Sequence, residues 1–164
     1  LMNILYLEDD FINAEQSKDI INFYNNHSIH SFKYHNGFNN ISYPLSILNQ
    51  YKNEQLLNTS VSRIVKICKG FISDAKLDNL EIVKRHPGSS MSYHVDTEFG
   101  DVLSGIVYLN DDYSGGSTGF ESFQVEPKVG RLIIFSNSHY RHCVNEVKGN
   151  DRYTLSSWFV KNPV

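Results

Sequence analysis

Residues 142–160 read HCVNEVKGNDRYTLSSWFV, and this stretch gives the clearest indication of the fold. Neighbouring side chains on a β-strand point to opposite faces, so an alternating sequence predicts a strand with two different sides. One side carries Arg152, Thr154, Ser156 and Trp158, and the other carries Tyr153, Leu155, Ser157 and Phe159. The second set is mostly apolar and suits packing against helices. The turn-forming residues Lys148–Asp151 precede this strand and predict a hairpin with an earlier one.

Similar patterns fill the second half of the chain. Short runs of β-branched and aromatic residues alternate with Gly-, Pro- and Asp-containing turns. The expected strands are Leu80–Arg85, Tyr93–Asp96, Val102–Leu109, Phe120–Val125, Arg131–Phe135, His142–Val147 and Arg152–Val160. Helices followed by about seven strands predict an α+β, mainly β protein, in which an antiparallel sandwich or barrel has helices packed on one sheet.

The first half of the chain favours helices. Asn13 can cap a helix that runs to about Tyr24, with Gln16 at the capping-box position. One face of this helix would hold Ala14, Ser17, Ile21 and Tyr24. The polar stretch Asn36–Pro44 is expected to be a loop. A second helix, capped by Ser60, is predicted from the apolar stripe Val61, Ile64, Val65, Cys68, Phe71 and Ile72.

Length and composition narrow the class of protein. The 164 residues suit one domain, with a helical part at about 10–78 and a β core at about 80–160. A net charge of −3 argues against a strongly basic nucleic-acid clamp, and two cysteines exclude a disulfide scaffold. No apolar run is long enough to span a membrane, and the first residues do not resemble a signal peptide. We therefore expect no membrane partner and a cytoplasmic location in a bacterium or the host of a phage, without secretion.

A candidate metal site begins at His94 and Asp96. Two residues apart on a strand, they would point to the same face and offer one imidazole nitrogen and one carboxylate oxygen to one ion. His142 is the best third ligand because it opens a strand in the same half of the chain. His139, three residues earlier, competes for that role. Two histidines and one carboxylate form the facial triad of non-haem Fe(II) oxygenases.

Arg152 is a candidate anchor for a carboxylate. Its position in the alternation places the guanidinium inside the predicted barrel, where burial requires an anionic partner. The planar guanidinium fork is a bidentate receptor for carboxylates.

Together these motifs resemble the iron- and 2-oxoglutarate-dependent oxygenases, and within them the prolyl 4-hydroxylase-like branch. His94-x-Asp96 is followed by His142 and, ten residues later, by Arg152. Further similar segments are Tyr108–Asn110, Gly115–Phe120, Gly130–Phe135 and His142–Val144, so the resemblance covers about Leu80 to Phe159. It implies a double-stranded β-helix (jelly roll).

The resemblance also implies roles for individual residues. His94, Asp96 and His142 would hold Fe(II). Arg152 and Tyr108 would hold the C5 carboxylate of the cosubstrate 2-oxoglutarate. The other implied contacts are Ile106 as a wall of the cofactor pocket, Thr154 as a further hydrogen-bond donor to that carboxylate, and Trp158 beside the metal. Ascorbate is an expected reductant.

The implied function is a 2-oxoglutarate-dependent dioxygenase that hydroxylates a C–H bond and releases succinate and CO2. The expected substrate is a prolyl residue in a peptide or protein. The same chemistry on another amino acid, a small metabolite or a nucleobase is an alternative, although the negative net charge disfavours nucleic acid. A jelly-roll binding module with a structural metal belongs to a different class, as does a cupin-type enzyme without a cosubstrate.

Some positions depart from the family pattern. Many relatives carry Tyr nine residues before the first metal-binding His, where this chain has Arg85. Collagen-type enzymes use Lys at the position of Arg152. The segment His86–Met91 keeps a glycine but lacks the usual aromatic residues. These differences concern the edge of the site that faces the substrate, and the loops Asn36–Pro44 and Thr97–Asp101 are expected to govern substrate choice.

Overall fold

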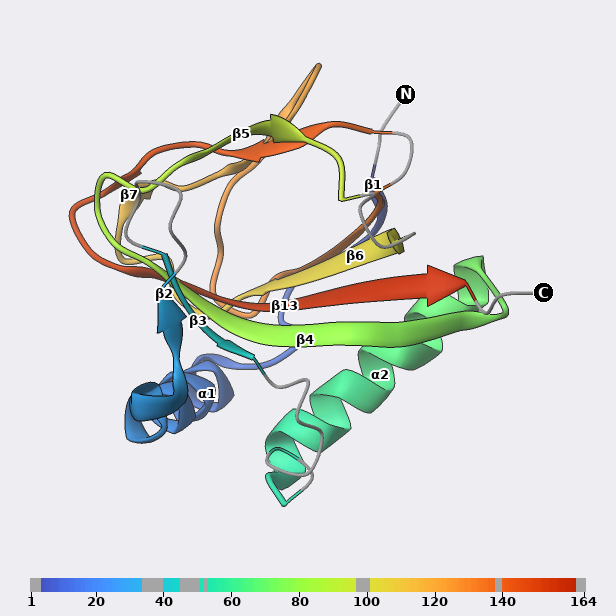
Figure 1. Cartoon of the computed structure of the whole chain (residues 1–164), viewed down its shortest axis with the longest axis horizontal. Coiled ribbons are helices and arrows are strands. Elements are labelled where there is room, and N and C mark those ends of the chain that lie inside the picture. The colour runs from blue at the N-terminus through green and yellow to red at the C-terminus, as the bar shows by residue number, and fades with distance from the viewer. Residues whose placement is uncertain are drawn as a thin grey trace.

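Two antiparallel sheets face each other, and the helices cover the outer side of the larger one (Figure 1). The computed structural model describes residues 4–33, 40–44, 51, 53–96, 101–137 and 140–161. No helix in these ranges is long and apolar enough to cross a membrane.

Within the described ranges, the larger sheet has seven strands. Their order is β1 (Ile4–Glu8), β10 (Leu132–Ser136), β6 (Asp101–Tyr108), β13 (Arg152–Lys161), β4 (Ala75–Arg85), β3 (Asn40–Pro44) and β2 (Phe32–Lys33). The smaller sheet has the order β5 (Met91–His94), β11 (His142–Val144), β8 (Thr118–Phe120) and β9 (Gln124–Val125), and β12 (Val147–Lys148) pairs with β7 (Ser114–Gly115). Strands far apart in sequence, such as β4 and β13, therefore lie side by side.

The first helix, α1 (Ala14–Asn26), begins as predicted. The Asn13 side chain accepts a hydrogen bond from the Gln16 amide at 2.8 Å, and the Gln16 side chain accepts one from the Asn13 amide at 2.9 Å. The predicted buried face is confirmed at Ser17 and Tyr24. The other buried residues of the helix are Ile20 and Phe23, in place of the predicted Ala14 and Ile21. A short 3-10 helix, η1 (Ser28–His30), follows.

The second helix, α2 (Gln55–Phe71), begins earlier than predicted, and its N-cap residue is Glu54. The predicted cap at Ser60 is wrong, because this residue is buried inside the helix and its hydroxyl donates to the Leu56 carbonyl at 2.8 Å. The apolar stripe is confirmed at Val61, Ile64 and Cys68, which are all buried. These residues join the main core between the helices and the larger sheet.

Several strand predictions need correction. Residues 40–44 form β3 and pair with β4, so the predicted loop is wrong there, while residues 36–39 lie outside the described ranges. The segment Phe120–Val125 contains the last residue of β8, a turn and β9, and His142–Val147 contains β11 and the start of β12. The strand β5 ends at His94, so Asp96 follows it. The part expected to be helical thus also contains β2 and β3.

The alternation in β13 is confirmed. Leu155 and Phe159 are buried in the core beneath the helices. Arg152, Thr154 and Trp158 instead line the space between the two sheets. This strand therefore separates the packed core from the candidate site.

Candidate metal and cosubstrate site

A pocket of about 540 Å³ lies between the two sheets. Strands β4, β6 and β13 supply one wall, and β5 and β11 supply the other. The predicted site residues that line it are His94, Asp96, Ile106, His142, Arg152, Thr154 and Trp158. Tyr108, which was also predicted for the site, does not line the pocket.

His94, Asp96 and His142 converge at one end of this pocket. Their ligand atoms all lie within 4.8 Å of one another. Asp96 Oδ1 is 3.2 Å from His94 Nε2, and Asp96 Oδ2 is 3.3 Å from His142 Nε2. His94 and His142 are directly paired across β5 and β11, which explains how residues distant in sequence meet. The competing His139 lies outside the described residues.

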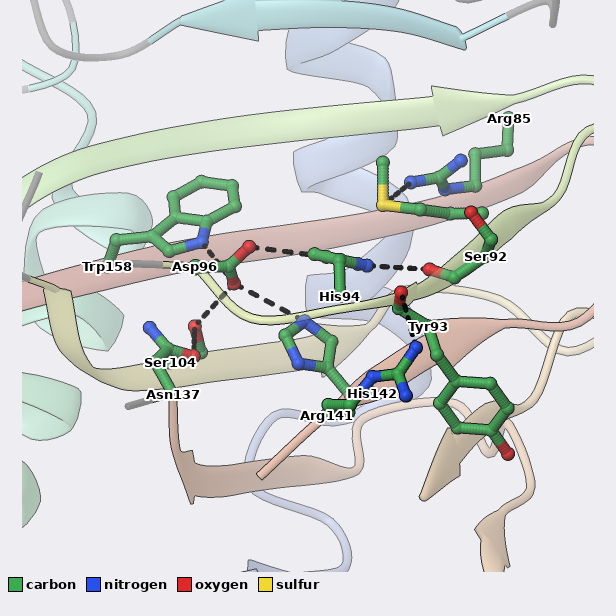
Figure 2. A network of polar contacts seen from close by, with 11 residues as sticks. Arg85, Ser92, Tyr93, His94, Asp96, Ser104, Asn137, Arg141, His142 and Trp158 are labelled. Carbon is green, nitrogen blue, oxygen red and sulfur yellow. Dashed lines mark hydrogen bonds and ion pairs between the residues drawn. The ribbon is translucent and has the colours of Figure 1, made fainter. Parts of the chain in front are cut away.

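Neighbouring groups fix the orientation of these side chains (Figure 2). His94 Nδ1 contacts the Ser92 carbonyl at 2.8 Å, which directs Nε2 toward Asp96. Asp96 Oδ2 accepts hydrogen bonds from Trp158 Nε1 at 3.2 Å and from the Ser104 hydroxyl at 3.4 Å. Such partners hold metal-binding side chains in position before the ion arrives.

The electrostatics favour an ionised carboxylate. Burial opposes ionisation of Asp96, but hydrogen bonds from His142 and His94 outweigh it and hold the pKa of Asp96 well below its usual range. The same contact with Asp96 raises the pKa of His94. One carboxylate and two imidazoles would occupy one face of a bound Fe(II) ion and leave its other coordination positions open for further ligands.

Arg152 lies in the same pocket and is 2% exposed. Its Nε donates to the Gly116 carbonyl at 2.8 Å, and its guanidinium carbon lies 5.4 Å from the centre of the Tyr108 ring. Arg152 Nη2 is buried and makes no hydrogen bond within the described residues. A buried guanidinium with a free N–H fits an incoming carboxylate.

The remaining predicted residues occupy different positions around this end. Tyr108 is fully buried, and its hydroxyl forms a hydrogen bond with Thr118, which does line the pocket. The Thr154 hydroxyl contacts that of Ser156 at 3.0 Å. Thr118 was missed in the sequence because its pocket-facing position follows from the pairing of β8 with β11.

Arg85 is a residue that sequence reasoning placed only at the substrate-facing edge of the site, without a role. It is 7% exposed and lines the pocket. The sequence showed only that it departs from the family pattern. Its pairing with Arg152 across β4 and β13 could not be seen before the register was known.

A sequence model of the 2OG-Fe(II) oxygenase superfamily matches residues 80–160, which include the three convergent ligands and Arg152. The chain belongs to this superfamily. Membership implies Fe(II) and 2-oxoglutarate, and the donor set and the free guanidinium N–H described above fit both.

Curated relatives of this 2OG-Fe(II) oxygenase are prolyl hydroxylases. Prolyl 3-hydroxylase 1 of Gallus gallus is 34% identical over 68 residues, which cover 37% of this chain and 9% of the relative. Prolyl 3-hydroxylase 3 of Mus musculus is 27% identical over 129 residues, which cover 67% of this chain and 17% of the relative. The chain thus spans less than a fifth of either relative.

Solved structures share its double-stranded β-helix. The viral collagen prolyl hydroxylase of Paramecium Bursaria Chlorella virus-1 matches with a TM-score of 0.74 at 15% identity, covering 99% of this chain and 97% of that one. A Pseudomonas putida prolyl-4-hydroxylase matches with a TM-score of 0.68 at 18% identity, covering 96% and 92%. A Trichoplax adhaerens prolyl hydroxylase bound to a hypoxia inducible factor peptide matches with a TM-score of 0.73 at 15% identity, covering 95% and 83%.

Proposed function

We propose that this 2OG-Fe(II) oxygenase hydroxylates a prolyl residue in a peptide or protein and releases succinate and CO2. The observation that carries the oxygenase chemistry is the pocket that contains both the convergent triad and a buried arginine with a free N–H. The prolyl substrate is supported by the relatives, which are named as prolyl 3-hydroxylases.

The residues of the chain have separate tasks in this proposal. His94, Asp96 and His142 would hold Fe(II), which with bound 2-oxoglutarate supplies the oxidation of a C–H bond by dioxygen. Arg152 would bind the far carboxylate of 2-oxoglutarate and so fix its direction in the pocket. Trp158 and Ser104 would keep Asp96 in its ligand orientation through their hydrogen bonds to Oδ2.

The surface next to the triad suits a peptide. Tyr93 and Val95 flank His94 in sequence and are 43% and 37% exposed, and Tyr140, two residues before His142, is 37% exposed. The Arg141 guanidinium lies 5.8 Å from the centre of the Tyr93 ring. Val95 lines the pocket, and an exposed apolar side chain there favours contact with an apolar ring such as that of proline. Tyr93 instead precedes His94 on β5, and its ring points away from the triad (Figure 2).

The substrate proposal is tested by mass spectrometry. The protein is incubated with Fe(II), 2-oxoglutarate and a library of peptides that differ only in whether they contain proline. We expect a mass gain of one oxygen atom in proline-containing peptides, together with succinate release. The Asp96→Ala variant should lose this activity, whereas His30→Ala, which removes an exposed imidazole in η1, should retain it.

Two results would contradict the proposal in different ways. If another amino acid or a metabolite is hydroxylated and proline is not, the oxygenase assignment stands but the prolyl substrate is wrong. If the Asp96→Ala variant turns over 2-oxoglutarate as fast as the wild type, Asp96 is not a metal ligand and the metal assignment is wrong. Ascorbate as a reductant and a cytoplasmic location stay predictions.

A further inference from the structure

A second buried guanidinium lies directly beside the anchor Arg152. Arg85 ends β4, Arg152 begins β13, and the two residues are opposite one another in the antiparallel ladder. Directly opposed residues share one face of the sheet, with their Cβ atoms about 4.5–5.5 Å apart. Both line the same pocket and are 7% and 2% exposed.

The two charges are not compensated within the described residues. Arg85 Nη1 contacts the Ser89 hydroxyl at 3.3 Å and Nη2 contacts Met91 Sδ at 3.8 Å, and both partners are neutral. Arg152 Nε donates to a backbone carbonyl, and no ion pair of the described residues includes either arginine. Burial, and then the charge of Arg152, lower the pKa of Arg85. Opposed like charges in a buried site destabilise the fold.

Each arginine also keeps one buried N–H without a hydrogen bond among the described residues. These atoms are Arg85 Nε and Arg152 Nη2. A buried donor without a partner costs free energy, and a charged one costs more. The contacts of Arg85 with Ser89 and Met91 do not require a positive charge, because a neutral side chain could make equivalent contacts. They therefore do not explain why a charged side chain is buried here. A carboxylate bound between the two guanidinium groups would accept from both donors and offset one of the two positive charges.

We propose that Arg85 and Arg152 form one receptor with two guanidinium groups for the far carboxylate of 2-oxoglutarate. Arg85 is thereby a specificity-determining residue that strengthens the selection of dicarboxylic over monocarboxylic 2-oxo acids. This proposal rests on the use of 2-oxoglutarate but not on a prolyl substrate. It gives a physical reason for arginine at the position where many relatives carry tyrosine.

Ligand binding tests the receptor without catalysis. Calorimetric titrations of the Mn(II)-loaded protein compare 2-oxoglutarate with 2-oxopentanoate, which has the same carbon chain but lacks the far carboxylate. In Arg85→Gln we expect 2-oxoglutarate to bind roughly 10- to 100-fold more weakly, because a charged hydrogen bond is lost. The affinity for 2-oxopentanoate should not change.

Lys84→Gln is the matched control. Lys84 precedes Arg85 on β4 but faces the other side, where it pairs with Asp151 at 3.4 Å. This variant removes the same charge from the same strand and should bind both ligands like the wild type. Equal weakening of both ligands in Arg85→Gln, or no weakening of either, would overturn the proposal.

Thermal melting distinguishes a ligand-binding role of Arg85 from a structural one. Without ligand, the melting temperature of Arg85→Gln should be at least that of the wild type, since a like-charge contact is relieved. A lower melting temperature together with loss of both ligands would make Arg85 structural and overturn the proposal.

The Arg152→Gln variant separates failure of the receptor from failure of the assigned cosubstrate. If the wild type binds 2-oxoglutarate and Arg152→Gln weakens it while Arg85→Gln does not, only the receptor proposal fails. If the wild type does not bind 2-oxoglutarate, the assigned cosubstrate fails as well.

Discussion

Asp96 is the side chain on which the metal site depends. Each of its oxygens faces a different histidine, and Oδ2 also accepts the hydrogen bonds of Trp158 and Ser104. The Ser104 hydroxyl also lies 2.7 Å from Oδ1 of the fully buried Asn137, so its single proton is shared between Asn137 and Asp96. The carboxylate is therefore oriented by a buried polar network.

The Trp158→Phe variant tests this network. It keeps an aromatic ring but removes the N–H that orients Asp96, so we expect Mn(II) to bind roughly 10-fold more weakly, as is usual when a partner of a metal ligand is lost. Isothermal titration calorimetry measures the affinity. Tyr93→Phe is a suitable control, because the Tyr93 hydroxyl contacts the Phe120 carbonyl and no metal ligand. Equal affinities in Trp158→Phe and the wild type would show that the indole does not support the site.

The residues that could be predicted from sequence are those with a fixed spacing. His94, Asp96, His142 and Arg152 follow a recognisable pattern, and the structure brings all four to one pocket. Ser104 follows no such pattern, Thr118 lies in a family-like segment that was given no role, and Arg85 was noted only as a departure from the family. Their roles depend on strand register and burial, which local sequence does not encode.

The connection before β10 depends on a glycine that touches the segment between β1 and α1. Gly130 has a φ of +79°, its amide donates to the Tyr108 carbonyl at 2.8 Å, and its carbonyl accepts from the Phe11 amide at 3.0 Å. A Cβ at this position would lie 2.0 Å from the Ile12 carbonyl oxygen. The backbone therefore has no room for a side chain here.

We expect Gly130→Ala to lower the free energy of unfolding by about 3 kcal/mol or more, because strain and a clash with backbone combine. Gly149→Ala is the control. Gly149 has a φ of +87°, but a Cβ there would meet no atom within 4 Å. Strain alone should cost about 1–2 kcal/mol in that variant. Urea denaturation measures both, and equal losses would contradict the proposed contact.

An ion-pair cluster joins the end of β1 to the segment before β10. Asp9 accepts hydrogen bonds from Arg131 Nε at 2.7 Å and Lys128 Nζ at 3.1 Å. The hydrogen bond from Arg131, and then that from Lys128, lower the pKa of Asp9 to about 2. A lowered folded-state pKa stabilises the protein above the unfolded pKa of about 3.9, and this contribution is lost as the pH falls toward 2.

The Asp9→Asn variant should therefore be less stable than the wild type at about pH 5, by no more than about 1 kcal/mol because Asp9 is partly exposed. The difference should close between about pH 4 and pH 2. Denaturation midpoints across this range provide the measurement. A difference that does not change with pH would show that the Asp9 charge is not involved.

Elements with a strong internal pattern were predictable, and elements defined by their neighbours were not. The alternation of β13 and the stripe of α2 were sufficient to assign both. The strand β3 is short and ends in a proline, and it pairs with the edge of β4 that β13 leaves free. The predicted strand over Tyr93–Asp96 ends at His94, yet Asp96 still reaches both histidines from beyond the strand.

Across the whole molecule, the main core and the candidate site occupy different sides of the large sheet. The helices and the apolar faces of β6 and β13 form the main core on one side. The pocket with its titratable residues lies on the other side, between the two sheets. The opposite face also contributes to a second apolar cluster with the smaller sheet, so the polar site occupies only part of it. This cluster consists of Tyr108, Phe120, Val125, Ile133 and Phe135.

The claim that this pocket binds iron and 2-oxoglutarate together is tested most directly by anaerobic absorption spectroscopy. Fe(II) and 2-oxoglutarate are added to the protein separately and then together in the absence of oxygen. We expect a weak visible charge-transfer band when both are present and none with either alone, and we expect Asp96→Ala to show no band. A wild-type protein without the band, or an Asp96→Ala variant that keeps it, would contradict the assignment.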